Sequence, residues 1–455
     1  MSQTVRIING IVVDADSSFP ADLLIRDGKI EAVSAPGMKG EADRTIDASG
    51  RYLLPGAVDE HTHMMDPGIT EREEFETGTA AAAYGGVTTV VDHHRTVPAV
   101  YEISSLEEKI EYLKEKAVVD FGLKGGISPD NTDRLEAMWN RGITGFKTFT
   151  CNLHGVKAMY PGILKRAFTE VKRWNGTVLI HCEDDSICQI NEQQLRAAGR
   201  TDFASQNAWR SALAEEVAVE AVIAVAKETG ARVVIAHVSQ AKLLKRIREA
   251  YEEGAEIYAE TCPHYLYLTS RDVEKNGPWM KFTPPPRDEK NLEEMWRLYN
   301  LGYVSVIGSD HCPYPKSDKL PGEKNIWDAP NGIPGVETSL RIMLNAVNEG
   351  KTTLNQVVRT MCENPAKLEG LYPKKGNLRP GADGDVVIVD MEKEEKIQND
   401  RVISKCRWSP YDGRTLKGAP ETVLVRGQIV VDHYHVVGRP GMGRFIERVS
   451  TGGLR

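Results

Sequence analysis

The two ends of the chain contain short runs that are either apolar or alternate apolar and polar residues, as is typical of β-strands. The strand-like segments are residues 5–13, 22–26, 29–33, 385–389 and 423–431. Asp27-Gly28, between two of them, is a typical hairpin turn. We therefore expect the N- and C-terminal segments to pair into one small β-sandwich domain.

The middle of the chain has a different rhythm, in which strand-like apolar runs alternate with amphipathic helix-like runs. The strand-like runs include residues 88–91, 177–180, 232–235, 257–259 and 304–307. The helix-like runs include residues 106–116, 212–229 and 241–253, and Gly230 ends the second of these. Such alternation indicates a parallel β/α architecture.

A (β/α)8 TIM-like barrel and an open, doubly wound sheet both fit this alternation. Residues with ligand chemistry follow several of the apolar runs, and a barrel brings the C-terminal ends of all its strands around one site. This placement favours the barrel. We expect residues 53–375 to form the barrel, residues 1–52 the first part of the β-domain, and residues 376–455 its second part with a C-terminal tail.

Four histidines, a lysine and an aspartate stand at or just after the ends of apolar runs. They are His61, His63, Lys147, His181, His237 and Asp310. His61 and His63 are two residues apart, so on a strand they face the same side and can reach one metal. Each residue alone has a plain explanation, as a core histidine, a helix cap or a solvated lysine. Together the six predict a site for two metal ions.

The chemistry of this set points to hydrolysis. Imidazole and carboxylate ligands suit zinc, with manganese, cobalt or iron as alternatives. A protonated lysine cannot ligate a metal, but CO2 can convert the Lys147 amine into a carbamate whose two oxygens bridge two ions. Two ions about 3.5–4 Å apart can share a hydroxide and polarise a carbonyl group. An aspartate beside them can move a proton from the hydroxide to a leaving nitrogen, which is a way to break amide-like C–N bonds.

Composition and charge exclude several other classes of function. The net charge is −8, and no dense cluster of lysine and arginine predicts a nucleic-acid partner. No run approaches the roughly 18 apolar residues of a membrane helix, so no membrane partner is expected. The seven cysteines contain no CxxC pair, which fits reduced thiols in the cytoplasm.

Longer motifs add a family resemblance. They are residues 55–68 (PGAVDEHTHMMDPG), 75–82 (FETGTAAA), 85–89 (GGVTT), 260–266 (ETCPHYL), 331–340 (NGIPGVETSL) and 408–413 (WSPYDG). Together they resemble the cyclic-amidase branch of the amidohydrolase superfamily, which contains hydantoinases, dihydropyrimidinases, allantoinases and dihydroorotases. The segments at 75–89 look most like allantoinases and dihydroorotases, and the last two motifs look most like hydantoinases. The resemblance covers nearly the whole chain.

The resemblance implies how the metals are held. His61 and His63 would bind one metal, and His181 and His237 the other. Carboxylated Lys147 would bridge the two ions. It also implies the barrel, the β-domain built from both ends of the chain, and a homo-oligomer that is a dimer or a tetramer.

The resemblance also implies the reaction. Asp310 would ligate the first metal and act as general base and then as general acid. Backbone groups of Thr283 and Asn331 match the positions that grip the ring amide. The substrate would be a small cyclic amide or ureide opened as by a hydantoinase or allantoinase, with dihydropyrimidinase and cyclic imide hydrolase as alternatives.

Four departures from the family pattern concern the substrate pocket. In one, the segment 206–210 (QNAWR) replaces the usual Ser-Arg-Pro before the strand-six helix. Many relatives have a tyrosine five residues after the bridging lysine; here Asn152 stands there with His154 nearby, and both are candidates for substrate contact or simple loop residues. The segment 92–95 (DHHR) replaces an apolar or Met-Pro segment, and either recognises an anionic or carbonyl-rich ring or forms a structural network. Met64 and Met65 stand where dihydroorotases carry an arginine for the substrate carboxylate, which argues against a dihydroorotase.

Two other classes were weighed against the hydrolase. A single-metal deaminase of the same superfamily would use a glutamate after the fifth strand as its acid and base, and Glu183 stands near that place, but Lys147 in its Gly-Phe-Lys context favours two metals. A non-catalytic, dihydropyrimidinase-like interaction protein would lack metal ligands, and none is missing here.

Overall fold

Eight parallel strands form a closed barrel in the computed structural model, which describes residues 3–454. They are β6 (Ala57–Thr62), β7 (Val87–Asp92), β8 (Asp120–Gly126), β9 (Gly145–Phe149), β10 (Thr177–His181), β11 (Arg232–Ile235), β12 (Ile257–Thr261) and β13 (Val306–Ile307), neighbours in chain order. A bridge between Thr62 and His311 joins the last strand region to the first. The predicted TIM-like barrel is confirmed, and the open sheet is excluded.

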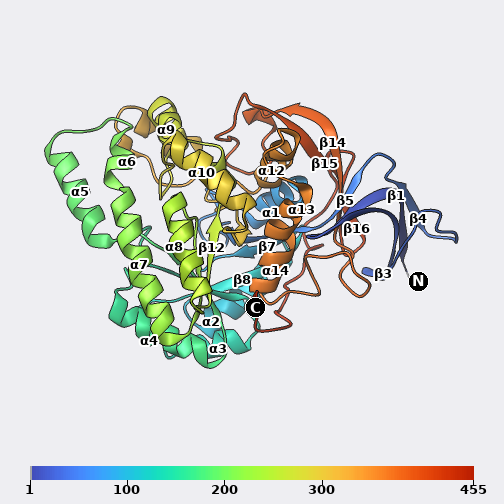
Figure 1. Cartoon of the computed structure of the whole chain (residues 1–455), viewed down its shortest axis with the longest axis horizontal. Helices are drawn as coiled ribbons and strands as arrows, with labels where there is room; N and C mark the ends of the chain where they lie inside the picture. The colour runs from blue at the N-terminus through green and yellow to red at the C-terminus, as the bar shows by residue number, and fades with distance from the viewer. Residues whose placement is uncertain (1–2, 455) are drawn as a thin grey trace.

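Helices cover the outside of the barrel (Figure 1). They include α1 (Phe75–Tyr84), α2 (Ile103–Lys114), α3 (Leu135–Asn140), α4 (Pro161–Arg173), α5 (Asp185–Ala197), α6 (Ser205–Trp209), α7 (Ala212–Thr229), α8 (Ala241–Glu252), α9 (Ser270–Asn276), α10 (Glu289–Asn300), α11 (Lys316–Lys319), α12 (Ser339–Asn348), α13 (Leu354–Val358) and α14 (Asn364–Leu368). Every residue of the eight strands is buried, as the helical cover of a parallel sheet requires.

Helix α7 illustrates how local sequence sets the elements. Its bounds are those predicted, because Ser211 caps the first turn by accepting a hydrogen bond from the backbone N–H of Ala214. At the other end Gly230 adopts φ +67°, the left-handed conformation that a helix C-terminus favours for glycine. The helix packs on α4 and α8 through its apolar stripe.

Both ends of the chain meet in one nine-stranded sheet, seen in Figure 1 as blue strands beside orange-red ones. Its strands are β1 (Thr4–Val13), β2 (Ser18–Arg26), β3 (Lys29–Ser34), β4 (Arg44–Asp47), β5 (Tyr52–Pro55), β14 (Val386–Lys396), β15 (Thr415–Val425), β16 (Gln428–Asp432) and β17 (His435–Val436). The predicted small β-domain made from both termini is confirmed.

The sheet folds over a core of its own. Leu23 and Ile25 from β2 pack with Val386 and Leu424 from the C-terminal strands. A Cβ added at Gly384 would lie 2.6 Å from Cγ2 of Ile25, so a glycine permits this close approach. The sandwich is therefore one continuous sheet curled on itself.

The last residues of the chain lie against the barrel. The backbone N–H of Phe121, at the start of β8, donates to the carbonyl oxygen of Arg444 (2.9 Å). The guanidinium of Arg232, at the start of β11, donates to the carbonyl oxygen of Thr451 (2.6 Å). The tail thus crosses the N-terminal ends of the strands and leaves their C-terminal ends open. Within residues 3–454 no helix has the length and apolar character needed to cross a membrane.

A buried ion network joins the barrel to the small domain. The ammonium group of Lys375, whose side chain is 1% exposed, lies 2.5 Å from Asp120 of β8, 3.0 Å from Asp383 and 2.7 Å from Asp385. Asp383 and Asp385 lead into β14. One lysine therefore neutralises carboxylates from both domains.

We expect Lys375→Met to destabilise the protein by about 3 kcal/mol, because three buried carboxylates lose their shared cation, although Arg426 still pairs with Asp120 and Lys29 with Asp383. Denaturation in urea, followed by circular dichroism, measures the change. Lys157→Met is the matched control, since Lys157 pairs with Asp130 on the exposed surface, where such a pair contributes about 0–1 kcal/mol. Equal unfolding midpoints for the two variants would contradict the role given to Lys375.

Candidate metal centre

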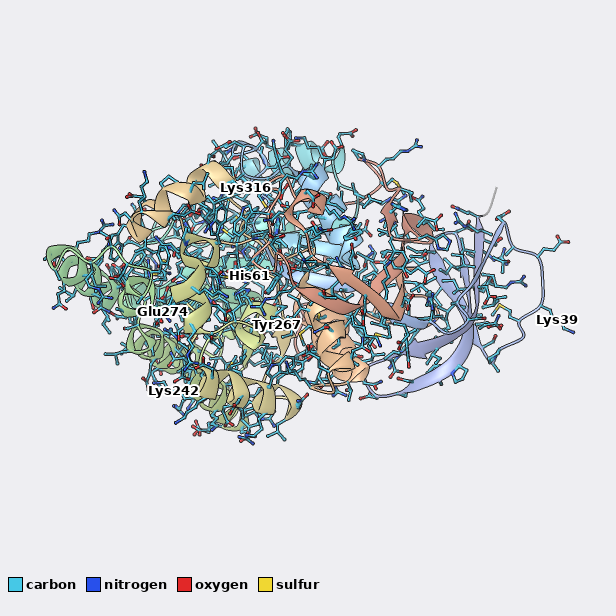
Figure 2. The ribbon with its side chains drawn as sticks, turned by 90° about the horizontal axis from the view of Figure 1, so that it is seen from above. Lys39, His61, Lys242, Tyr267, Glu274 and Lys316 are labelled. Carbon is cyan, nitrogen blue, oxygen red and sulfur yellow. The ribbon has the colours of Figure 1, made fainter. Side chains whose placement is uncertain are left out.

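The six predicted ligands lie at the C-terminal ends of five barrel strands. His61 and His63 end β6, Lys147 lies in β9 and His181 ends β10, while the remaining two follow β11 and β13. All six line one cavity. Figure 2 shows His61 within the barrel and Lys39 at the opposite end of the molecule, in the small domain.

Four of these side chains converge around the imidazole of His61. Its Nε2 atom lies 3.2 Å from Nζ of Lys147 and 3.1 Å from Oδ1 of Asp310. The same aspartate oxygen lies 3.3 Å from Nε2 of His63. Burial lowers the pKa of both histidines well below the ordinary value, so each ring is a neutral imidazole with a free lone pair. These are the donor groups that a divalent ion requires.

The other two histidines form a second donor pair. Nδ1 of His181 lies 2.9 Å from Nε2 of His237, and Nε2 of His181 lies 2.8 Å from a carboxylate oxygen of Glu183. Although burial opposes the shift, Cys151 and Glu183 raise the pKa of His181 to about 9, so without a metal the Nδ1–H of His181 donates to His237 while its Nε2–H donates to Glu183. A cation can take the place of the proton between the two rings. The pair fits a second metal.

Backbone strain accompanies two of the ligands. His237 and Asp310 adopt φ of 39° and 45°, a region that residues with a Cβ seldom occupy. Hydrogen bonds of their neighbours hold them there. The backbone N–H of Val238 donates to the carbonyl oxygen of Glu260 (2.8 Å), and the backbone N–H of Ser309 donates to the carboxylate of Asp59 (3.0 Å). Such strain, supported by neighbours, is characteristic of functional positions.

Lys147 is the unusual member of the set. Its side chain is fully buried, and within residues 3–454 no carboxylate lies in ion-pair distance of its amine. Burial lowers the pKa of Lys147 to about 8, although Glu260 and Asp310 oppose the shift. A buried lysine amine with such a lowered pKa, surrounded by metal-binding groups, fits a modified ligand better than a permanent cation.

Glu260, at the end of β12, supports the first metal position and was not singled out from the sequence. Its carboxylate oxygens lie 2.8 and 3.0 Å from Nδ1 of His61. A carboxylate there accepts the Nδ1 proton and directs the Nε2 lone pair at the metal. Only the alternation of Ile257 to Thr261 hinted that this side chain points inward.

Glu260→Gln is expected to lower the affinity for the first metal by about 10- to 100-fold, because the amide no longer fixes the His61 tautomer. Competition with a chelator of known affinity measures it. Glu274→Gln, at an exposed position seen in Figure 2, is the control. Unchanged metal affinity in Glu260→Gln would show that His61 is oriented by other means.

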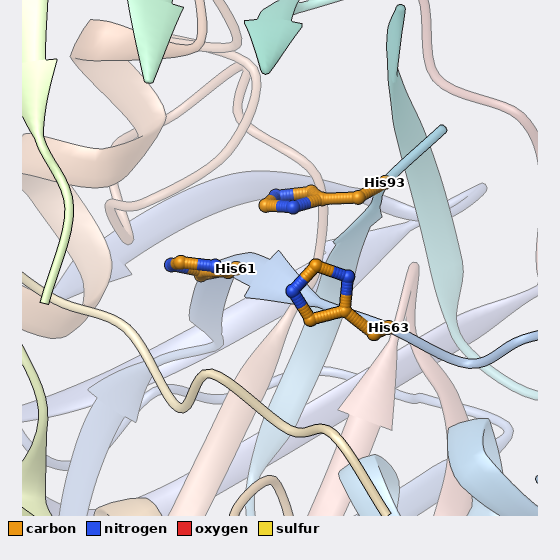
Figure 3. A group of neighbouring side chains, drawn as sticks. All are labelled: His61, His63 and His93. Carbon is orange, nitrogen blue, oxygen red and sulfur yellow. The ribbon is translucent and has the colours of Figure 1, made fainter. Parts of the chain in front are cut away.

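The segment 92–95 divides into separate roles. Asp92 is buried, pairs with Lys109 (2.6 Å) and accepts the N–H of Met64 (2.8 Å). His93 stacks on His61 with ring centroids 4.6 Å apart and donates from Nε2 to the carbonyl oxygen of Glu60 (3.1 Å), as Figure 3 shows for the rings. These two residues serve the structural network that was one of the two interpretations of the segment.

The other two residues of the segment differ. His94 packs its ring near Tyr101 and Phe149, with centroids 5.2 and 6.3 Å away. Arg95 instead lines the cavity. Part of the segment is thus in a position to meet a substrate.

The predicted substrate residues fall into two groups. Thr283 and Asn331 line the cavity and are tied together by Gln206, whose amide donates to the carbonyl of Phe282 (2.9 Å) and to Oδ1 of Asn331 (3.0 Å). His154 also lines the cavity. Asn152 lies outside it, and its amide donates to Asp185 (2.6 Å).

Residues 52–430 match the Amidohydrolase family. The chain belongs to the amidohydrolase family. An L-hydantoinase from Paenarthrobacter aurescens is 37% identical over 441 residues, which cover 96% of each chain. An allantoinase from Salmonella newport (strain SL254) is 32% identical over 454 residues, covering 98% of this chain and 99% of the relative.

A solved structure of similar shape is the L-hydantoinase (dihydropyrimidinase) from Arthrobacter aurescens. It superposes with a TM-score of 0.96 at 36% identity and covers 98% of this chain and 100% of its own. These likenesses place this amidohydrolase in the cyclic-amidase branch, as the motifs predicted.

Glu183, the residue on which a deaminase reading depends, is firmly held in this amidohydrolase. Its carboxylate accepts from Arg210 (3.2 Å), from Thr283 (2.7 Å) and from His181. Although burial opposes the shift, Arg210 and His181 lower the pKa of Glu183 to about 2. A carboxylate held so firmly in its ionised form is poorly suited to carry protons near neutral pH.

Proposed function

We propose that the protein hydrolyses a C–N bond of a cyclic amide or ureide with two divalent metal ions, as in hydantoinase- or allantoinase-type ring opening. The observation that carries the proposal is the convergence of the six donor side chains in one cavity. His61 and His63 would hold one ion, and His181 and His237 the other. Zinc suits these ligands best, with manganese, cobalt or iron as alternatives.

Lys147 joins the two positions as a carbamate. The neutral amine attacks the carbon of CO2, an N–C bond forms, and one amine proton is released to solvent. Burial favours this step, since it lowers the pKa of Lys147 to about 8 and so raises the fraction of neutral amine. The product is a carbamate anion with two oxygens. It stands among the four histidines where the protonated lysine would be a cation.

Asp310 moves the proton. Its carboxylate takes a proton from the attacking water and returns it to the ring nitrogen as the C–N bond breaks. Burial raises the pKa of Asp310, and Lys147 opposes the shift, so the carboxylate is a stronger base than an exposed one. The ions, when bound, polarise the substrate carbonyl and acidify water.

The ring is held by the two loops that Gln206 ties together. Backbone groups of Thr283 and Asn331 grip the ring amide, and the hydrogen bonds of Gln206 keep their spacing fixed before substrate arrives. Contact of Asn152 with substrate stays a prediction, since its side chain is engaged by Asp185.

His154 takes the place of the missing tyrosine. Its Nδ1 lies 3.5 Å from the hydroxyl of Tyr314, and burial lowers its pKa well below the ordinary value. If the hydroxyl donates to Nδ1, the neutral ring carries its proton on Nε2 and presents a donor to the developing oxyanion.

His154→Phe is expected to lower kcat by about 10²-fold with a smaller change in KM, because the donor acts chiefly in the transition state. Steady-state kinetics on the best ring substrate measures this. His435→Phe, on the exposed strand β17, serves as control. A kcat for His154→Phe equal to that of the control would remove His154 from the catalytic site.

The assembly and the compartment complete the proposal. We expect a homodimer or homotetramer in the cytoplasm. The seven cysteines are all buried as free thiols, which is compatible with a reducing compartment.

Ring-opening assays test the proposal. The panel is hydantoin, 5-substituted hydantoins of both hands, allantoin, dihydrouracil and succinimide, with enzyme whose metal content has been counted. Release of the ring-opened acid from one of them, with about two metals per chain, is the expected result. Fully loaded enzyme that opens no ring would contradict the proposed function.

A further inference from the structure

Arg95 is a charged side chain of the cavity for which the metal centre has no use. It follows β7, and it lines the same cavity as the ligands. It lies close enough to influence the ionisation of His63 and Asp310. Arg95 therefore borders the space where a substrate would lie.

The charge of Arg95 has no carboxylate partner among the described residues. Its strongest electrostatic neighbours are Cys312, Tyr314, Arg72 and Tyr101, and none of these carries a carboxylate. Three other shielded arginines of this chain are each paired with a carboxylate. Arg210 pairs with Glu183 (3.2 Å), Arg287 with Glu215 (2.9 Å) and Arg341 with Glu395 (2.6 Å).

Arg72 is a second cation near Arg95, although it does not itself line the cavity. The guanidinium of Arg72 stacks over the ring of Tyr314, 3.5 Å from its centroid, and donates to the carbonyl oxygen of Pro313 (2.9 Å). Among the described residues that line the cavity, Asp310 alone is acidic, and it belongs to the ligand cluster. A partly buried charge without a counter-ion is costly, and an anionic ligand would relieve that cost.

We propose that Arg95 binds an anionic substituent, of carboxylate type, on the ring that this enzyme opens. The inference rests on the proposed ring-opening function and names its substrate class. A guanidinium offers two parallel N–H donors that match a carboxylate. Arg95 approaches from the loop after β7, whereas Thr283 and Asn331 come from the loops after β12 and β13. A ring gripped at its amide by those loops thus carries its substituent toward a different wall.

This assignment also concerns the missing dihydroorotase arginine. That residue would follow His63, where Met64 and Met65 are buried apolar side chains. Arg95 supplies a guanidinium from the neighbouring strand instead, so the absence of the first arginine does not make the pocket neutral.

The test compares two rings of nearly equal size, hydantoin-5-acetate and its neutral amide, 5-(carbamoylmethyl)hydantoin. We expect wild-type kcat/KM to favour the acid by about 10- to 100-fold, the range of a charge-assisted hydrogen-bonded pair. In Arg95→Met this ratio should fall to about one, and in Arg95→Lys to an intermediate value, since lysine keeps the charge without the fork. Arg379→Met, at an exposed position, should keep the wild-type ratio.

Calorimetric binding of the same two probes separates this inference from the proposed function. Tighter binding of the acid that is lost in Arg95→Met supports the inference, even if neither ring is opened and the proposed function fails. The inference is overturned, and ring opening stands, if the wild-type enzyme binds and opens the acid and the amide equally well and Arg95→Met shows the same acid-to-amide ratio of kcat/KM.

Discussion

Lys147→Ala is expected to lose the second metal and to lower turnover by at least about 10³-fold. Alanine removes the amine, so no carbamate can form, and four histidines with Asp310 must then hold two divalent ions without a bridging anion. Metal ions contribute several kcal/mol to such reactions, and each 1.4 kcal/mol changes a rate about tenfold. Metal counted by mass spectrometry and ring-opening kinetics on the same sample measure both effects.

Lys147→Met is the companion variant, because it keeps the volume of the buried side chain and removes only the amine. It should match alanine in metal loss while unfolding at a temperature closer to that of wild type. Two metals and full turnover in either variant would show that Lys147 is no part of the centre.

Asp310→Asn is expected to fold normally and to lower kcat by about 10²-fold or more. Asparagine is nearly the same size, so the packing around the strained backbone at this position is preserved. Its amide cannot accept and return the proton that moves from water to the leaving nitrogen. Circular dichroism establishes the fold, and steady-state kinetics measures the loss.

Asp133→Asn, at an exposed position outside the cavity, is the control for this charge change. A kcat for Asp310→Asn within a few-fold of the control would mean that another group carries the proton. The next group to examine would then be His264. Burial lowers the pKa of this histidine to about 4, although Asp310 opposes the shift.

Much of the fold follows from local pattern. The α7 helix is bounded by a serine cap and a glycine stop, and the hairpin between β2 and β3 turns at Asp27-Gly28, where both residues have positive φ. β13 was expected over residues 304–307 but spans only Val306–Ile307. It pairs with β12 at only two residues, and beyond its end a single bridge between Thr62 and His311 joins it to the β6 side of the barrel. The few hydrogen-bonded neighbours on both sides limit the length of this strand.

The site was predictable to the extent that it depends on strand ends. His61, Lys147 and His181 each end or lie in a buried strand, and the barrel brings those ends together. The roles of Glu260 and Gln206 were not predicted, because they consist of contacts to distant segments, His61 in one case and Asn331 in the other. Spacing along the chain carries no signal of such pairs.

The most direct test of the account is the ring-opening rate of chelator-stripped enzyme as zinc is added back in the presence of bicarbonate. The rate should rise until about two ions per chain are bound and then level off, and ¹³C-labelled bicarbonate should give a carbamate signal that Lys147→Ala lacks. A rate that is complete at one ion per chain, with no carbamate signal, would contradict the two-metal centre and favour a single-metal enzyme.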